Sequence, residues 1–332
     1  MSTDDLLGHL SRAPEFDLVK VTGMRERRVA GSVAEVPEDS LTMAVAAART
    51  CLGRSRYTAA EIDIVISCSI SRITDGNRLQ FEPSFAFRIA RELGAVEAIH
   101  FDVSNACAGM TTGVLLLDRL IRSGAVRNGL VLSGELITPI AFTAAREMED
   151  SRDPQFASMS VGDSAVAVML DRAVDERDVI HDVELMTSSQ YAELCLAMPS
   201  DKSGGMAMYT DNREMHARDR LALWPAFQRD RLAERGSTFA AEGYGFIIHH
   251  QVGSRFVDCV NAVGSRAFGV PMPESLNILD KFANTASTSH YLVLHQALAE
   301  GRIPRGSKVL MVPAASGVVT GFLSATVSCL EV

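Results

Sequence analysis

The sequence predicts an α/β fold made of two related halves, and two observations carry that prediction. Apolar runs typical of buried strands alternate along the chain with segments that have the 3.6-residue period of helices. In addition, residues 107–132 can be overlaid without a gap on residues 284–309, which puts Gly124 on Gly301 and Cys107 on Asn284. The alternation favours an α/β architecture. The overlay favours two halves about a pseudo-twofold axis, with two helix starts meeting there.

Each half has its own series of expected elements. In the first half we expect a helix at 41–52, a strand at 62–70, a helix at 83–93, a strand at 98–103, a helix from Cys107 to about Ser123, and strands at 129–134 and 164–170. In the second half we expect a strand near 179–186, a long helix within 213–235, a strand at 244–249, helices at 252–263 and from Thr285 to Glu300, and strands at 308–313 and 321–329. The segments 135–160 and 187–212 fit neither period and are expected to cross the surface or a site. We place the boundary between the halves at 172/173.

Composition narrows the class of protein. Of the 332 residues, 47% are hydrophobic and 22% are charged, which predicts a sizeable core rather than disorder. A net charge of −9 argues against nucleic-acid binding, although local arginines can still serve phosphate-bearing ligands. The N-terminal residues lack a signal-peptide pattern, and no apolar run is long enough to cross a membrane. We expect a cytoplasmic protein without membrane insertion.

The cysteines and histidines do not form metal-binding or disulfide patterns. Six cysteines are scattered without paired spacing, which in a chain of this size indicates buried thiols. They are Cys51, Cys68, Cys107, Cys195, Cys259 and Cys329. We expect neither a metal ion nor a permanently bound cofactor.

Cys107 lies in FDVSNACAGMTTGV, at a predicted strand-to-helix turn. The positive end of a helix dipole and its free N–H groups favour a thiolate. The Cys107 N–H is also placed to face a developing oxyanion. The alternative interpretation is a small buried hydrophobic residue, the usual role of a free cysteine.

His249 and His250 end an apolar strand in GYGFIIHHQVGSR, where side chains of α/β folds enter clefts. The alternative is a pair of solvent-facing histidines. His290 and His295 are expected on a helix surface.

Glu82 and two glycines have both a functional and a structural interpretation. Glu82 precedes Pro83, which is expected to be the first residue of a helix, so the structural interpretation of Glu82 is a cap carboxylate. Gly317 and Gly321 in AASGVVTGF are expected in a loop between strands, either as backbone donors to a substrate or as ordinary hairpin residues.

Three motifs in order, FDVSNACAGM, HHQVGSR and FANTASTS, resemble those of β-ketoacyl-acyl-carrier-protein synthase III and its relatives. The resemblance extends from TGMRERRV at 22–29 through GDSAVAVML at 162–170 to the C-terminal SGVVTGFLSATV. It implies the thiolase-like fold, a five-layer αβαβα sandwich of two duplicated halves, and a homodimer. Residues 1–172 would then carry the nucleophilic cysteine, and residues 173–332 the histidine and asparagine.

The resemblance also implies roles for individual residues. Cys107 matches the acylated nucleophile, His250 matches the family histidine better than His249 does, and Asn284 matches the family asparagine. Gly317 resembles the second oxyanion-hole donor beside the Cys107 amide. Arg255 resembles a basic residue near the pantetheine entrance.

Three departures from the family pattern affect the substrates. The usual opening strand and its glycine-containing loop are missing before residue 17. The positions of a Trp and an Arg that grip coenzyme A fall near Asp17 and Val21, so acyl-coenzyme A and acyl-carrier protein both stay open as donors. Glu82 in FEPS replaces an aromatic residue and is similar to the head-to-head condensing enzymes of olefin synthesis. In those enzymes a glutamate reaches across the dimer and acts as the base.

The leading hypothesis is a Claisen condensation of two acyl thioesters through acyl-Cys107, in fatty-acid-like or secondary-metabolite biosynthesis. His250 and Asn284 would stabilise the enolate oxygen, and Glu82 would remove the α-proton. Two alternatives stay open: acyl transfer from Cys107 to a hydroxyl or amine, and a non-catalytic subunit of a heteromeric synthase. Chain length, second substrate and decarboxylation are not specified by the sequence.

Overall fold

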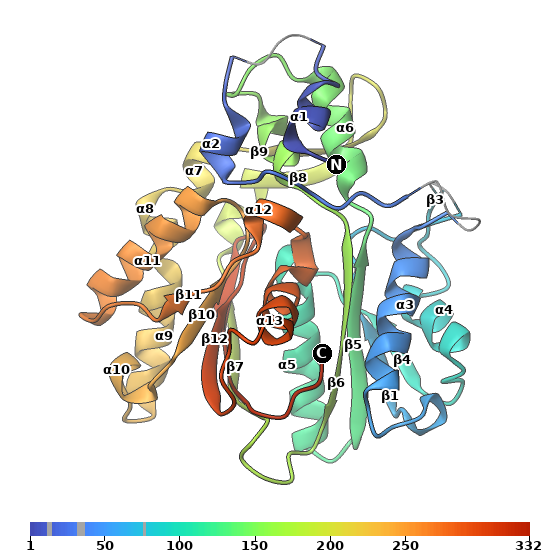
Figure 1. Ribbon diagram of the computed structural model, residues 1–332, viewed down its shortest axis with the longest axis vertical. Helices are drawn as coiled ribbons and strands as arrows, with labels where there is room; N and C mark the ends of the chain where they lie inside the picture. Colours follow the sequence, from blue (N-terminus) through green and yellow to red (C-terminus); the bar gives the residue numbers. More distant parts are fainter. Residues whose placement is uncertain (12–14, 32–36, 76–77) are drawn as a thin grey trace.

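The chain forms a sandwich of alternating helical and sheet layers (Figure 1). The computed structural model describes residues 1–11, 15–31, 37–75 and 78–332. Two helices cover the outer face of the first sheet, two more lie between the sheets, and a third group covers the outer face of the second sheet (Figure 1). This order of layers confirms the αβαβα sandwich predicted for the chain. From the first outer layer to the last, the helices are α3 (Ser40–Gly53), α4 (Phe85–Leu93), α5 (Gly109–Arg122), α13 (Ser289–Ala299), α9 (Leu223–Glu234), α10 (Phe239–Glu242) and α11 (Ser254–Phe268).

The first sheet has the strand order β4-β1-β5-β6. β1 runs parallel to β4 and β5, whereas β6 is antiparallel to β5. β1 is buried along its whole length because helices cover both faces, which explains its continuous apolar sequence. The strands are β1 (Ile64–Ser67), β4 (Ile99–Asp102), β5 (Asn128–Glu135) and β6 (Ser164–Asp171).

The second sheet has the order β11-β10-β12-β14, and β14 also pairs with β13 and β7. β10 is parallel to β11 and β12, and β14 is antiparallel to β12 and β7. The strands are β7 (Val179–Thr187), β10 (Phe246–His249), β11 (Glu274–Ser275), β12 (Ser307–Val312), β13 (Ala314–Ala315) and β14 (Val319–Val327). The first sheet thus ends at Asp171 and the second begins at Val179; the boundary at 172/173 stays a prediction.

The two halves share backbone details at the positions that the overlay pairs. Ala106 and Ala283 both have left-handed backbones, with φ of 46° and 60°. Gly124 and Gly301 follow α5 and α13 and have φ of 77° and 67°, as expected for glycine after a helix. These agreements support the duplication inferred from the sequence.

Three clusters of core residues match the layers. Buried apolar side chains of α3 and α4 pack on the first sheet. Those of α5 and α13 fill the space between the two sheets. Those of α9 and α11 pack on the far face of the second sheet. The functional residues lie at one end of these layers.

The segments 135–160 and 187–212 have regular structure, which the sequence did not predict. Both contribute to the cap at the top of Figure 1, and both line the cavity described below. The remaining elements are α1 (Thr3–Leu7), α2 (Leu18–Thr22), η1 (Ala59–Glu61), β2 (Ile73–Thr74), β3 (Arg78–Leu79), η2 (Ala106–Ala108), α6 (Thr138–Glu147), η3 (Pro154–Ser160), η4 (Ser189–Leu194), β8 (Cys195–Pro199), β9 (Met206–Thr210), α7 (Asn212–Met215), α8 (Arg218–Leu221), α12 (Leu279–Phe282) and η5 (Ala286–Thr288).

The single long helix predicted within 213–235 is wrong. The segment forms three helices, α7, α8 and α9, and Ala222 both ends α8 and begins α9. Pro225 explains the second break, because a proline has no N–H and its ring clashes with the carbonyl four residues earlier, here Leu221.

The start of α4 also differs from the prediction. Pro83 is not its first residue, because Ser84 is the N-cap and its Oγ accepts from the Phe87 N–H at 3.2 Å. Asp102 of β4 accepts from the N–H groups of Phe85 and Ala86, each at 2.8 Å. Glu82 therefore does not cap α4.

Candidate active site

Cys107 lies in the turn η2 between β4 and α5, as the sequence predicted. The turn requires an unusual backbone, because Ala106 has a φ of 46°. It also requires a glycine, since a Cβ on Gly109 would lie 2.9 Å from the Cys68 carbonyl oxygen. Left-handed backbone at a non-glycine residue costs about 1–2 kcal/mol. Such strain is often found where a side chain must be held in a functional position.

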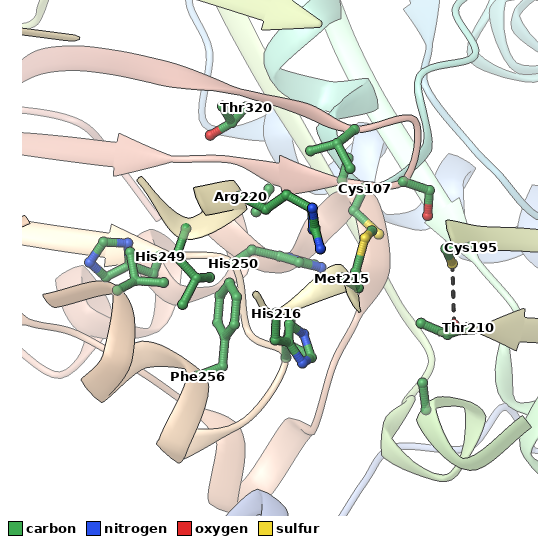
Figure 2. A pocket seen from close by; sticks show the side chains of 18 of the residues that line it. Cys107, Cys195, Thr210, Met215, His216, Arg220, His249, His250, Phe256 and Thr320 are labelled. Atoms are coloured by element: carbon green, nitrogen blue, oxygen red, sulfur yellow. Dashed lines mark hydrogen bonds between the residues drawn. The ribbon is translucent and has the colours of Figure 1, made fainter. Parts of the chain in front are cut away.

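A cavity of about 130 Å³ lies in front of Cys107. His250 and Asn284 line the same cavity, although they come from β10–α11 and from the turn before η5. Figure 2 shows Cys107 and His250 on its walls. The structure therefore brings together the three residues that the sequence motifs singled out. They lie up to 177 positions apart along the chain.

His249 and His250 point to opposite faces of the second sheet. His249 Nε2 lies 2.8 Å from Asn261 Oδ1 on α11, and its ring packs edge-on against Trp224. His250 instead stacks on His290 of α13, with ring centroids 5.7 Å apart. Both are buried, so the alternative of solvent-facing histidines is wrong.

Burial and the neighbouring His290 lower the pKa of His250 to about 3. Burial likewise lowers the pKa of His290 to about 4. His250 is therefore a neutral imidazole at pH 7 and can accept a proton. The prediction that His290 lies on a helix surface is wrong: it is fully buried, and its Nε2 lies 3.0 Å from the Val312 carbonyl oxygen.

Asn284 is fixed by its own backbone and by η5. Its N–H donates to Ser160 O and its carbonyl accepts from the Gly162 N–H, both at 2.9 Å. Its side-chain Oδ1 accepts from the Ala286 N–H at 3.0 Å. Because the oxygen is engaged, the amide Nδ2 is the group left to donate a hydrogen bond into the cavity.

Burial raises the pKa of the Cys107 thiol, and the nearby Cys195 and Glu135 raise it further. A hydrogen bond from the Cys107 backbone lowers the pKa by less. Burial thus opposes the thiolate that the helix start is predicted to favour. The thiol is protonated at pH 7, and its reaction as a nucleophile needs a base.

Gly317 lies in the turn between β13 and β14, with a φ of 124°. This turn is adjacent to the nucleophile, because Ala315 and Val319 pack with Ala108 and Cys107 in one apolar cluster. Gly321, which the sequence analysis assigned to the same loop, lies inside β14. A Cβ there would meet the Glu184 carbonyl oxygen at 2.1 Å, so its role is close strand packing.

Arg255 and Glu82 are both exposed. Arg255 is the second residue of α11, between Val252 and Phe256, which line the cavity. Glu82 does not line the cavity. The position of Arg255 agrees with a place near the mouth of the site.

Several cavity residues were missed by sequence reasoning. Cys195 and Thr210 come from the β8–β9 hairpin, and Thr210 Oγ1 donates to Cys195 Sγ at 3.3 Å. Arg220 and Trp224 come from the broken α8–α9 helix. No motif marks these residues. The one available signal was Pro225, which predicts that a helix cannot run through this segment.

Among the described residues, no group of three or more His, Cys, Asp or Glu side chains could hold a metal ion. Within the same part of the chain, no helix is long and apolar enough to span a membrane.

Two family models match the chain in order, and together they span more than half of it. The model for 3-oxoacyl-[acyl-carrier-protein] synthase III matches residues 101–189, and its C-terminal counterpart matches residues 236–326. Among curated proteins, the chain is 27% identical to the β-ketoacyl-[acyl-carrier-protein] synthase III of Aquifex aeolicus, with 92% of each chain covered. It is also 27% identical to the enzyme of the same name from Sphingopyxis alaskensis, over 97% of this chain and 92% of that one.

Solved structures share the fold. The 3-oxoacyl-[acyl-carrier-protein] synthase III of Aquifex aeolicus superposes with a TM-score of 0.79 at 24% identity, covering 98% of this chain and 95% of the other. A structure of Xanthomonas campestris OleA with bound lauric acid and lauroyl-CoA superposes with a TM-score of 0.82 at 19% identity, covering 98% and 94%. The chain belongs to the 3-oxoacyl-[acyl-carrier-protein] synthase III family of the thiolase superfamily. It is an acyltransferase of the condensing class, which joins acyl groups by Claisen condensation.

Proposed function

We propose that this enzyme condenses two acyl thioesters through an acyl-thioester intermediate on Cys107. The observation that carries the proposal is the convergence of Cys107, His250 and Asn284 on one cavity. A nucleophile, a neutral imidazole and an amide donor are the groups that acyl loading and enolate stabilisation require. No cofactor takes part in these steps.

In the loading step, His250 accepts the Cys107 proton as the sulfur attacks the donor carbonyl carbon. The tetrahedral oxyanion is stabilised by backbone N–H groups, for which Cys107 and Gly317 are the candidates. The intermediate collapses with loss of the donor thiolate, which takes up a proton and leaves. His250 is unprotonated at pH 7, so its ring is available to accept this proton.

In the condensing step, the second thioester becomes an enolate whose oxygen accepts hydrogen bonds from His250 and from the Asn284 amide. The enolate carbon attacks the acyl-Cys107 carbonyl, and the Cys107 thiolate leaves. An amide donor directed at an enolate has no comparable use in acyl transfer to a hydroxyl or amine. The Asn284 geometry therefore favours condensation over that alternative.

We further propose that the active enzyme is a homodimer in which Glu82 serves the partner's cavity. β4 is an edge of the first sheet, and Ile99 on it is 56% exposed. The segment leading into α4 exposes Leu79 by 53% and Phe81 by 73%. Apolar side chains beside an open strand edge favour pairing with another copy. Glu82 follows Phe81 directly, so this interface would carry it toward the partner as the base for α-proton removal.

The donor we propose is an acyl-carrier-protein thioester. Asp17 is occupied as the N-cap of α2, where its carboxylate accepts from the Lys20 N–H at 2.9 Å. Val21 is an exposed aliphatic residue and offers no ring to stack on adenine. α2 ends at Gly23 against Ser254, next to Arg255, which leaves a basic residue for the phosphopantetheine arm. We place the reaction in fatty-acid-like or secondary-metabolite synthesis in the cytoplasm.

The test is mass spectrometry of the intact protein, and then of its peptides, after incubation with matched acyl-coenzyme A and acyl-carrier-protein thioesters. We expect the added acyl mass on Cys107, formed faster from the carrier protein. Cys195 lines the same cavity, so Cys195→Ser is the matched control and should still be acylated. Acyl mass on Cys195 or Cys68 with Cys107 unmodified would overturn the mechanism.

A further inference from the structure

Residues that line the cavity lie on both sides of Cys107. Figure 2 shows Cys195 and Thr210 on one side, and His249 and Thr320 on the other. The part of the cavity on the second side is here called the inner arm, and several of its lining residues pack in the core between the second sheet and the outer helices α9 and α11. The inner arm is lined by Trp224, His249, Val260, Val312 and Thr320.

The walls of the inner arm are side chains that are held in place. All five of its residues are buried. Trp224 Nε1 donates to Gln228 Oε1 at 2.7 Å, and its ring packs against His249 with centroids 5.3 Å apart. His249 is in turn held by Asn261 at 2.8 Å. Because close-packed cores resist expansion, a longer ligand could not extend the arm without breaking these contacts.

The size of the cavity limits what the arm can hold. A closed apolar cavity of about 150 Å³ binds benzene. The cavity here is about 130 Å³, including the space in front of Cys107. An acyl group of roughly the size of a benzene ring therefore fills it, whereas a chain of twelve or more carbons has at least twice as many carbon atoms.

We propose that the inner arm holds the acyl group of acyl-Cys107 and restricts it to compact groups of about six or seven carbons, linear, branched or aromatic. The proposal rests on the acyl-Cys107 intermediate described above. It separates this enzyme from condensing enzymes that join long chains, even though Glu82 resembles the base of that branch. The wall formed by Trp224, His249 and Val260 is the specificity determinant.

The experiment measures loading of Cys107 by a series of N-acetylcysteamine thioesters: acetyl, butyryl, hexanoyl, benzoyl, decanoyl and lauroyl. One small leaving group throughout removes any contribution from carrier recognition. We expect loading to fall at least tenfold between the hexanoyl or benzoyl thioester and the decanoyl thioester.

Val260→Ala should load decanoyl faster than the wild type does, and Val260→Leu should lower the size limit for the acyl group. Val263 lies on the same helix and is buried outside the cavity, so Val263→Ala is the matched control and should keep the wild-type profile.

The results separate the two proposals. If lauroyl loads as fast as hexanoyl, or if both Val260 variants keep the wild-type profile, the size limit is wrong while the acyl-enzyme stands. If none of the thioesters acylates Cys107, the acyl-enzyme mechanism itself fails and the size limit fails with it.

Discussion

For the individual residues, the proposed loading step requires a proton to move from Cys107 to His250. The Cys107 thiol is protonated because burial raises its pKa, and His250 is unprotonated because burial lowers its pKa to about 3. The same desolvation thus leaves both groups uncharged on the walls of one cavity, and it makes the thiol a weaker acid and the imidazole a weaker base. We therefore expect the proton to leave the thiol only as the sulfur attacks the thioester carbonyl.

This arrangement predicts different defects for the two polar residues. His250→Ala should slow acyl loading by about 100-fold or more, the usual effect of losing a general base. Asn284→Ala should load Cys107 at near the wild-type rate and then fail to condense, because its amide is needed for the enolate oxygen. Quenched-flow mass spectrometry separates the two steps. Equal loss of loading in both variants would show that the proposed division of roles is incorrect.

A second prediction concerns pH and stability. The pKa of His290 in the folded chain is about 4, below its value of 6.5 when exposed. Between these values the unfolded chain binds a proton that the folded chain does not, so the free energy of unfolding falls as the pH falls below 6.5. For one such histidine the loss between pH 6.5 and pH 5 is about 2 kcal/mol.

Urea unfolding of wild type and His290→Gln at both pH values measures this effect. The variant should lose about 2 kcal/mol less than the wild type over this interval, because glutamine does not titrate. The comparison uses the change with pH in each protein, so a uniform destabilisation by the substitution does not affect it. Identical changes in the two proteins would contradict the prediction.

At the scale of elements, the start of α4 links the first sheet to the proposed dimer interface. Asp102 holds the first N–H groups of α4, and Ser84 holds the third. Asp102→Ala should lower the free energy of unfolding by about 1–2 kcal/mol, the typical cost of a lost N-cap. Glu82→Gln, which removes no cap, should change it by less than about 0.5 kcal/mol. Urea denaturation measures the free energy of unfolding of both variants. A larger loss for Glu82→Gln than predicted would show that Glu82 has a structural role.

At the scale of the whole molecule, the proposed dimer makes each cavity depend on two chains. Glu82→Gln alone should keep acylation of Cys107 and abolish condensation with a non-malonyl substrate, together with exchange of that substrate's α-hydrogens. Cys107→Ala alone should be inactive. Hybrids of the two variants contain one cavity with Cys107 from one chain and Glu82 from the other.

Mixing the two inactive variants under conditions that exchange subunits should therefore restore activity. With equal amounts and random exchange, half of the dimers are hybrids with one intact site each, which gives about a quarter of the wild-type rate. Phe81→Glu in both chains is the control, because it should weaken the interface and prevent the recovery. No recovery from verified hybrid dimers would mean that Glu82 does not act across subunits.

Local sequence patterns were enough to predict the α/β class, the duplication and the three residues that meet at the cavity. Those features follow from patterns within short stretches of the sequence. The patterns are the apolar periodicity, the overlay of 107–132 on 284–309, and short motifs around Cys107, His250 and Asn284. The tertiary structure decided what no local pattern specifies. It buried His290 and the Cys107 thiol, so that burial raises the pKa of that thiol. It also placed Ser84 and Asp102, and not Glu82, at the start of α4, and Trp224 on the wall of the inner arm. Each of these depends on how much water a group loses and which distant atoms replace it, and that is set only when the layers pack together.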